Sequence, residues 1–144
     1  MRKRIDNSKE ERQPVLLCIL MIYLFVVMYI TLFNREIGVR RSMLEPFFEI
    51  RSMIDTKRYQ YWLGQIFGNL IMLFPLGVLL PMISDWFEKT KRTALAGLTV
   101  SLFIELTQYI TGRGLCELDD IVHNTMGAIA GILVYKKIIF VSTK

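Results

Sequence analysis

Four long apolar runs divide the chain, and each is long enough to cross a membrane as a helix. A helix rises about 1.5 Å per residue, so about 20 apolar residues span the roughly 30 Å hydrocarbon core of a bilayer. The pattern predicts an all-α, polytopic membrane bundle with four transmembrane helices, at residues 14–33, 62–83, 93–111 and 119–135. We expect one membrane domain over residues 14–141, preceded by a basic tail at residues 1–13.

The connection between the first two runs contains a different pattern. Pro46 is a favourable first helical residue, and after it Phe47, Ile50 and Ile54 fall on one face while Glu49 falls among polar residues elsewhere. This spacing predicts a short amphipathic helix in the first outer connection, which lies on the membrane surface or caps the bundle.

Composition and charge agree with a membrane protein. Hydrophobic residues make up 53% of the chain. The formal charge of +5 comes from basic residues dispersed at the ends of the apolar runs rather than on one helix face, so no nucleic-acid partner is expected. Eleven of the 18 lysines and arginines fall on the side of the two termini, which predicts that both termini are cytoplasmic. This topology separates Cys18 from Cys116, so no intramolecular disulfide is expected.

Small residues and prolines recur in the second and fourth runs. Two G-x-x-x-G pairs permit close contact between helices, and proline bends a helix or frays its end. We predict packing roles for six residues: Gly64, Gly68, Pro75, Gly77, Gly127 and Gly131.

Polar and charged side chains lie inside or beside the last two apolar runs. Such residues are costly in a membrane, by roughly 2 to 3 kcal/mol for a charge at the bilayer centre, and they are often functional. At about 1.5 Å per residue, Glu105 lies about 9 Å and Asn124 about 6 Å from the outer helix ends. The sequence predicts one outward-facing polar network or binding pocket formed by Asn69, Glu105, Gln108, Arg113, Asp119, Asp120 and Asn124.

Arg113 is the expected partner of Glu105, because its long side chain can reach down into the bundle. Two interpretations remain open at this stage. The network holds helices together, or it binds an amphiphile in the outer leaflet. Glu105, Asp119, Asp120 and His123 could in principle bind a divalent cation, but His123 falls on a different face from the expected neighbours of Glu105, so no metal and no cofactor is predicted. No serine, cysteine or histidine is placed as a nucleophile with its base, so no catalytic residue is assigned.

Three segments together resemble the VanZ-like family of small bacterial membrane proteins. The segments are GNLIMLFPLGVLLP, IELTQYITGRG and ELDDIVHNTMGAIAG. They match the family pattern at Asn69, Leu70, Phe74, Pro75, Gly77, Glu105, Gln108, Arg113, Asp120, Asn124 and Gly127, although Phe74 comes one residue later than usual. Leu44, Pro46 and Phe47 resemble the family's L-x-P-F segment, with Glu45 in its middle. The resemblance covers about residues 44–134.

The family is named for a protein linked to low-level teicoplanin resistance in Gram-positive bacteria. The resemblance implies a bacterial cell-membrane protein with a role in the cell envelope, and it implies no particular reaction. We expect an accessory factor that binds a lipid-linked or amphiphilic ligand and lowers susceptibility to glycopeptide or lipoglycopeptide antibiotics. The alternatives are a membrane-embedded enzyme acting on a lipid-linked envelope intermediate and a structural subunit of a membrane complex. The sequence does not indicate the oligomeric state.

Overall fold

The computed structural model describes residues 2–33, 37–38 and 40–142, with side chains from residue 12 onward. Arg35 and most basic residues of the N-terminal tail, which entered the topology count, therefore have no described side chains. In chain order the elements are α1 (Arg2–Met28), the π-helix η1 (Tyr29–Phe33), β1 (Arg41–Met43), α2 (Phe48–Thr56), α3 (Tyr59–Ile83), the 3-10 helix η2 (Asp85–Glu88), α4 (Thr90–Thr111), β2 (Leu115–Glu117) and α5 (Leu118–Ser142).

The predicted fold class is confirmed. Four helical segments are long and apolar enough to cross a membrane: Arg12–Phe33, Tyr59–Ile83, Thr90–Thr111 and Leu118–Val141. Each contains the predicted span and extends it at one end or both. Their outer surfaces carry large exposed apolar side chains such as Met21 and Phe25 on α1, at 67% and 69% exposure, as expected of lipid-facing helices.

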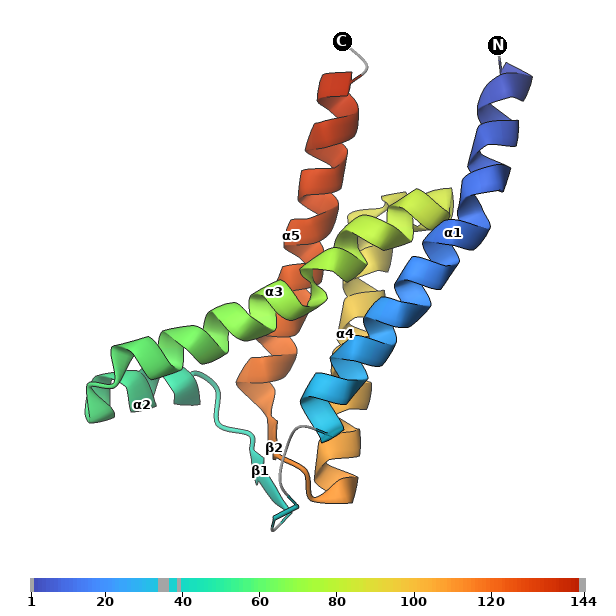
Figure 1. The fold of residues 1–144 in the computed structure, drawn as a ribbon. Coiled ribbons are helices and arrows are strands. Elements are labelled where there is room, and N and C mark those ends of the chain that lie inside the picture. Colours follow the sequence, from blue (N-terminus) through green and yellow to red (C-terminus); the bar gives the residue numbers. More distant parts are fainter. Residues whose placement is uncertain (1, 34–36, 39, 143–144) are drawn as a thin grey trace.

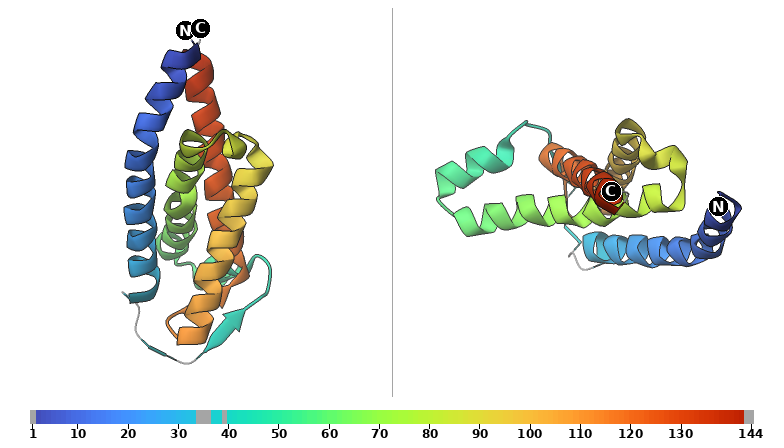
Figure 2. Two further views of the ribbon diagram at one scale, coloured as in Figure 1. Left: turned by 90° about the vertical axis from the view of Figure 1, so that its right-hand side faces the viewer. Right: turned by 90° about the horizontal axis from the view of Figure 1, so that it is seen from above.

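The helices are arranged so that α3 crosses the others obliquely (Figure 1). In this view α5 runs nearly upright, and α1 extends along the outside of the bundle. Both termini lie at the same end, which Figure 2 shows from the side. The two short strands lie at the opposite end.

Glycines bring α3 and α5 into backbone contact. A Cβ placed on Gly127 would lie 2.0 Å from the carbonyl oxygen of Leu70, and one on Gly131 would lie 2.2 Å from that of Phe74. On the facing helix, a Cβ on Gly77 would lie 2.0 Å from the carbonyl oxygen of Ala128. No larger residue fits at these three positions without moving a helix, so this crossing fixes α3 against α5.

The other glycine pair, Gly64 and Gly68, does not make the close helix contact that its spacing predicted. A Cβ on Gly64 or on Gly68 would have no neighbouring atom within 4 Å in the described part of the chain. The G-x-x-x-G spacing alone could not distinguish this pair from Gly127 and Gly131. The close contacts of Gly127 and Gly131 fall on Leu70, Phe74 and Gly77 of α3, which all lie beyond Gly68 in the chain.

A two-stranded parallel ladder joins the first and last connections, and the sequence did not predict it. Arg41, Ser42 and Met43 pair with Leu115, Cys116 and Glu117 respectively. The amide of Gly38 extends this contact by donating to the carbonyl of Gly112 at 2.8 Å. Gly112 has φ +67°, a left-handed conformation that ends α4 and that side chains rarely adopt.

The predicted amphipathic helix is present as α2, and it packs beside the start of α3. Trp62 meets the ring of Phe48 edge to face at 6.0 Å, and its indole N–H donates to the Thr56 hydroxyl at 3.0 Å. Phe47 and Ile54, on the predicted apolar face, are 71% and 61% exposed and are available to lipid. The opposite face of α2 therefore turns toward the bundle.

Candidate functional site

A cavity of about 570 Å³ lies between α1 and α3 and is closed at one end by polar residues of α4 and α5. Its walls are mostly apolar, with Val26 on α1, Ile30 on η1 and Ile71 on α3. Gly68 also lines it, so the missing side chain at that position leaves room in the cavity. The volume falls in the usual range for small-molecule sites.

Four of the predicted site residues meet at the polar end of this cavity: Asn69, Glu105, Gln108 and Asp120. Glu105, Gln108 and Asp120 are buried, with 2%, 1% and 7% exposure. None of the described lining residues is a lysine or an arginine. The cavity is therefore an apolar space that ends in carboxylates and amides.

Gln108 and Arg113 hold the end of the first membrane helix. The Gln108 amide donates to the carbonyl of Thr31 at 3.1 Å, and the Arg113 guanidinium donates to the carbonyl of Leu32 at 3.3 Å. Both acceptors lie in η1, where the last carbonyls of a helix have no partner in the helix itself. A cation at this end also opposes the negative pole of the helix dipole. These two residues thus position the α1 wall of the cavity.

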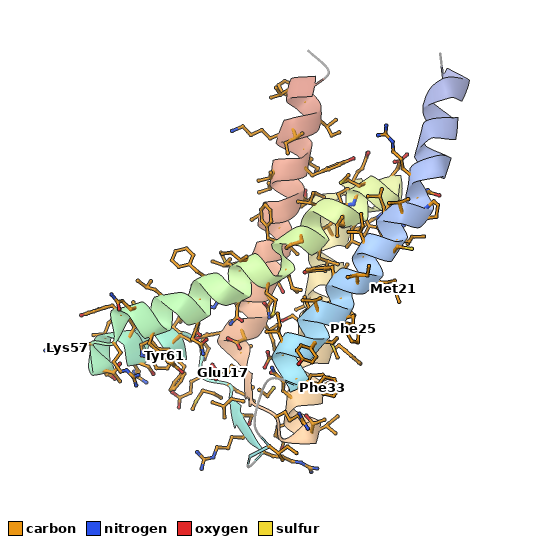
Figure 3. The ribbon with its side chains drawn as sticks, in the orientation of Figure 1. Met21, Phe25, Phe33, Lys57, Tyr61 and Glu117 are labelled. Carbon is orange, nitrogen blue, oxygen red and sulfur yellow. The ribbon has the colours of Figure 1, made fainter. Side chains whose placement is uncertain are left out.

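The structure does not bring Arg113 into the expected pair with Glu105. The Arg113 guanidinium lies 5.7 Å from the ring centre of Phe33, at the lower end of α1 in Figure 3, in addition to its bond to Leu32. Glu105 instead accepts a hydrogen bond from the backbone amide of Glu117 at 2.9 Å. The Arg113 side chain is long enough for the predicted pair with Glu105. Its guanidinium donates instead to a backbone carbonyl of η1, at the end of the first membrane helix.

Asn69 and Asn124 connect helices across the bundle. Asn69 on α3 donates to a carboxylate oxygen of Asp120 on α5. Asn124, which is fully buried, donates to the Ser101 hydroxyl on α4 at 3.0 Å. A buried polar group costs free energy unless it is hydrogen-bonded, so these bonds favour one particular arrangement of the three helices.

Asp119 connects α5 to the surface helix. Its two carboxylate oxygens accept hydrogen bonds from the backbone amides of Phe47 and Glu49, at 2.9 and 3.0 Å. These amides lie at the start of α2, where no side chain of the helix itself forms a cap. Asp119 is therefore a long-range N-cap that docks α2 on the bundle.

This docking brings in a residue that the sequence did not assign to the site. Glu49 is 1% exposed, and its Oε2 lies 3.0 Å from Nδ1 of His123. Burial, and then the charges of Asp120, Glu117 and Asp119, raise the pKa of Glu49 to about 8. The helical spacing placed Glu49 on the polar face correctly. What it could not indicate is that this face turns toward other acidic groups rather than toward water.

Several buried atoms at the site make no hydrogen bond to the described residues. They are Oε1 of Gln108, Oδ1 of Asn124, Oε2 of Glu49 and Nδ1 of His123. Buried polar atoms are rarely left in this state in native proteins. Three of the four are carboxylate or amide oxygens, so the site has spare capacity to accept hydrogen bonds.

The predicted residues thus divide into two groups. Asn69, Glu105, Gln108 and Asp120 face the cavity, whereas Arg113, Asp119 and Asn124 hold the surrounding elements. The packing prediction for Pro75 stays open, since Pro75 lies inside α3 and lines the cavity. A ligand-binding role for the first group stays a prediction that the geometry alone does not test.

The chain was compared with known protein families, curated proteins and solved structures. Residues 20–141 match the VanZ/LLP1 family, so the match covers most of the chain and includes every residue of the site. Comparison with curated proteins gave no match, and comparison with solved structures gave none either.

Proposed function

The chain belongs to the VanZ/LLP1 family, and we propose that it binds an amphiphile in the cell membrane through the cavity between α1 and α3. The apolar chain of the ligand lies along Val26, Ile30 and Ile71, and its head group meets the polar end. In the cell envelope this binding lowers susceptibility to glycopeptide or lipoglycopeptide antibiotics.

The observation that carries the proposal is the contrast between the two ends of one cavity. A pocket that is mostly apolar, with a few convergent polar groups, is the usual form of a small-molecule site. Here the cavity combines a wall formed by membrane helices with the buried carboxylates of Glu105 and Asp120. An occupant of both parts needs an acyl-like chain and a polar head.

The polar end also selects the chemistry of the head group. Carboxylates and amide oxygens accept hydrogen bonds, and Oε1 of Gln108 has no hydrogen-bond partner among the described residues. Since no described lining residue is a lysine or an arginine, no side chain of the lining would supply a positive charge to a phosphate group. The expected head group carries hydroxyl, amide or ammonium donors. A lipoglycopeptide offers such donors together with an acyl chain.

Two glycines on the same helix provide a matched test. Gly68 lines the cavity and Gly64 does not, while a Cβ added at either position has no neighbouring atom within 4 Å in the described part of the chain. Gly68→Leu should fill part of the cavity without disturbing the helix contact, and Gly64→Leu should leave the cavity unchanged. The measurement is binding of teicoplanin to protein in lipid nanodiscs, with vancomycin as the comparison that lacks the acyl chain.

We expect Gly68→Leu to weaken teicoplanin binding about tenfold, equivalent to about 1.4 kcal/mol, and Gly64→Leu to bind as the unaltered protein does. Susceptibility of cells that express each variant should follow the same order. Equal binding by both variants, or no preference for the acylated antibiotic, would contradict the proposal. Mass spectrometry of lipids that co-purify with the two variants provides a second measurement that does not depend on teicoplanin.

The group of buried carboxylates beside the cavity favours one other candidate function. Glu49, Glu105 and Asp120 lie close to the place where a head group would bind. An enzyme acting on a lipid-linked envelope intermediate would use such groups in acid–base chemistry. Turnover of a lipid-linked substrate by the purified protein, lost in Glu105→Gln, would favour the enzyme over the binding protein.

A further inference from the structure

Three carboxylates from separate parts of the chain converge beside the cavity. They are Glu49 on α2, Glu117 on β2 and Asp120 on α5, and we call them the three-carboxylate cluster. One oxygen from each lies within 4.8 Å of the others. Atoms that bind one metal ion from opposite sides lie about 4 to 5 Å apart, given bonds of roughly 2.0 to 2.6 Å. Figure 3 shows Glu117 beside the first turns of α5, below α3.

A second observation concerns Glu49 and His123. The Glu49 side chain is 1% exposed, and its Oε2 lies 3.0 Å from the imidazole Nδ1 of His123. Neither atom makes a hydrogen bond to any described residue, although the distance alone would permit one. The ring is therefore not oriented to donate to the carboxylate. The buried Glu49 carboxylate therefore keeps one oxygen without a hydrogen bond to the described residues, and Glu49 belongs to the three-carboxylate cluster.

Another polar residue holds the backbone of Glu49, the backbone of Glu117 and the carboxylate of Asp120 in turn. Asp119 accepts the backbone amide of Glu49, and Glu105 accepts that of Glu117. Asn69 donates directly to the carboxylate of Asp120. Metal ligands in proteins are commonly fixed by such an outer set of hydrogen bonds. This arrangement gives Asn69, Glu105 and Asp119 a shared role as positioning residues.

We propose that the three-carboxylate cluster binds one divalent cation, with His123 next to its Glu49 ligand. Carboxylate oxygens suit Mn²⁺ and are also ligands of Zn²⁺, so both ions are candidates.

The sequence could not place this site. Glu49 precedes Glu117 and Asp120 by about half the chain. The three carboxylates meet because Asp119 docks α2 and because β1 pairs with β2. No spacing in the chain indicates either contact.

The test measures metal binding by the purified full-length protein in detergent after treatment with a chelator. Mn²⁺ is titrated and the free ion is followed by electron paramagnetic resonance, and Zn²⁺ is then added as a competitor. The variants are Glu49→Gln and His123→Ala. Asp55→Asn is the matched control, because Asp55 is an exposed acid on the same helix.

We expect the unaltered protein and Asp55→Asn to bind about one Mn²⁺ per chain, which Zn²⁺ displaces. Glu49→Gln should bind at least about tenfold more weakly, and His123→Ala should also be weaker. A melting temperature measured without metal shows whether each variant is folded. If Glu49→Gln does not fold, the comparison of His123→Ala with Asp55→Asn still tests the proposal. Absence of Mn²⁺ and Zn²⁺ binding, or equal affinity in all variants, would overturn the proposal. The titration contains no antibiotic, so its result is independent of the proposed function.

Discussion

Asp119 caps a helix that begins far earlier in the chain, by accepting the backbone amide of Glu49 at 3.0 Å across a separation of 70 residues. A second bond to the amide of Phe47, at 2.9 Å, fixes the same end of α2. The carboxylate of one membrane helix thereby determines where the acidic face of a surface helix lies. Several expectations depend on this and related contacts.

The cap can be tested by removing its acceptor. Asp119→Ala should lower the free energy of unfolding by about 0.5 to 2 kcal/mol, the usual effect of losing an N-cap. Because α2 then loses its attachment, trypsin should cleave after Lys57 and Arg58 faster than in the unaltered protein. Asp55→Ala, at an exposed position of the same helix, should change neither quantity. Unchanged proteolysis of Asp119→Ala would show that other contacts dock α2.

The crossing of α3 and α5 can be tested by adding one methyl group. In Gly131→Ala the new Cβ would lie 2.2 Å from the carbonyl oxygen of Phe74, so the two helices must move apart. Overpacking of this kind costs about 1 to 3 kcal/mol. Gly64→Ala adds the same group where no atom lies within 4 Å, and it should not destabilise the protein. Unfolding in mixed detergent micelles would measure both. Equal stability of the two variants would contradict the close contact.

The separate partners of Glu105 and Arg113 predict little energetic coupling between them. Glu105→Gln weakens the bond to the Glu117 amide, whereas Arg113→Gln weakens the bond to the Leu32 carbonyl. The double variant should therefore lose about the sum of the two single losses, within about 0.5 kcal/mol. A direct ion pair would instead give a coupling energy well above that value, which the same unfolding measurements on four proteins would detect.

The orientation of the protein in the membrane can be tested at Cys116. The positive-inside tendency places both termini in the cytoplasm and Cys116 outside. A membrane-impermeant thiol reagent should therefore label Cys116 in intact cells that carry a Cys18→Ala variant. Burial and the charges of Glu105, Asp120 and Glu117 raise the pKa of this thiol, so labelling is best carried out in mildly alkaline buffer. Labelling only after the membrane is opened would reverse the topology.

The hydrophobic pattern was sufficient to predict the transmembrane helices. A long apolar helix is favourable in lipid by itself, so its place in the sequence does not depend on contacts with another helix. The pattern also identified the polar residues of α4 and α5 as inward-facing, since Glu105 and Asn124 would be costly against lipid. The exposed pair Gly64 and Gly68 shows the limit of such patterns. Spacing indicates which residues share a face, but the crossing point of two helices decides which face is covered.

The sequence could not predict the contacts between segments that lie far apart in the chain. The three-residue strands β1 and β2 are too short to carry a periodic signal, and their pairing depends on how the connections fold back. Arg113 illustrates a second cause. It was predicted to pair with the Glu105 side chain, but its acceptor is the backbone carbonyl of Leu32 in η1, and side-chain types alone do not show which backbone carbonyls are free to accept.

The cavity between α1 and α3 has a thermodynamic consequence for whatever occupies it. Both walls belong to segments that can cross the bilayer, so an amphiphile approaches from among the lipids. Its chemical potential is then set by its mole fraction in the membrane, and its concentration in water matters only through partitioning. Two compounds with identical contacts in the cavity will differ in apparent affinity if their acyl chains partition differently. Comparisons among ligands are therefore meaningful only when each is counted per lipid molecule.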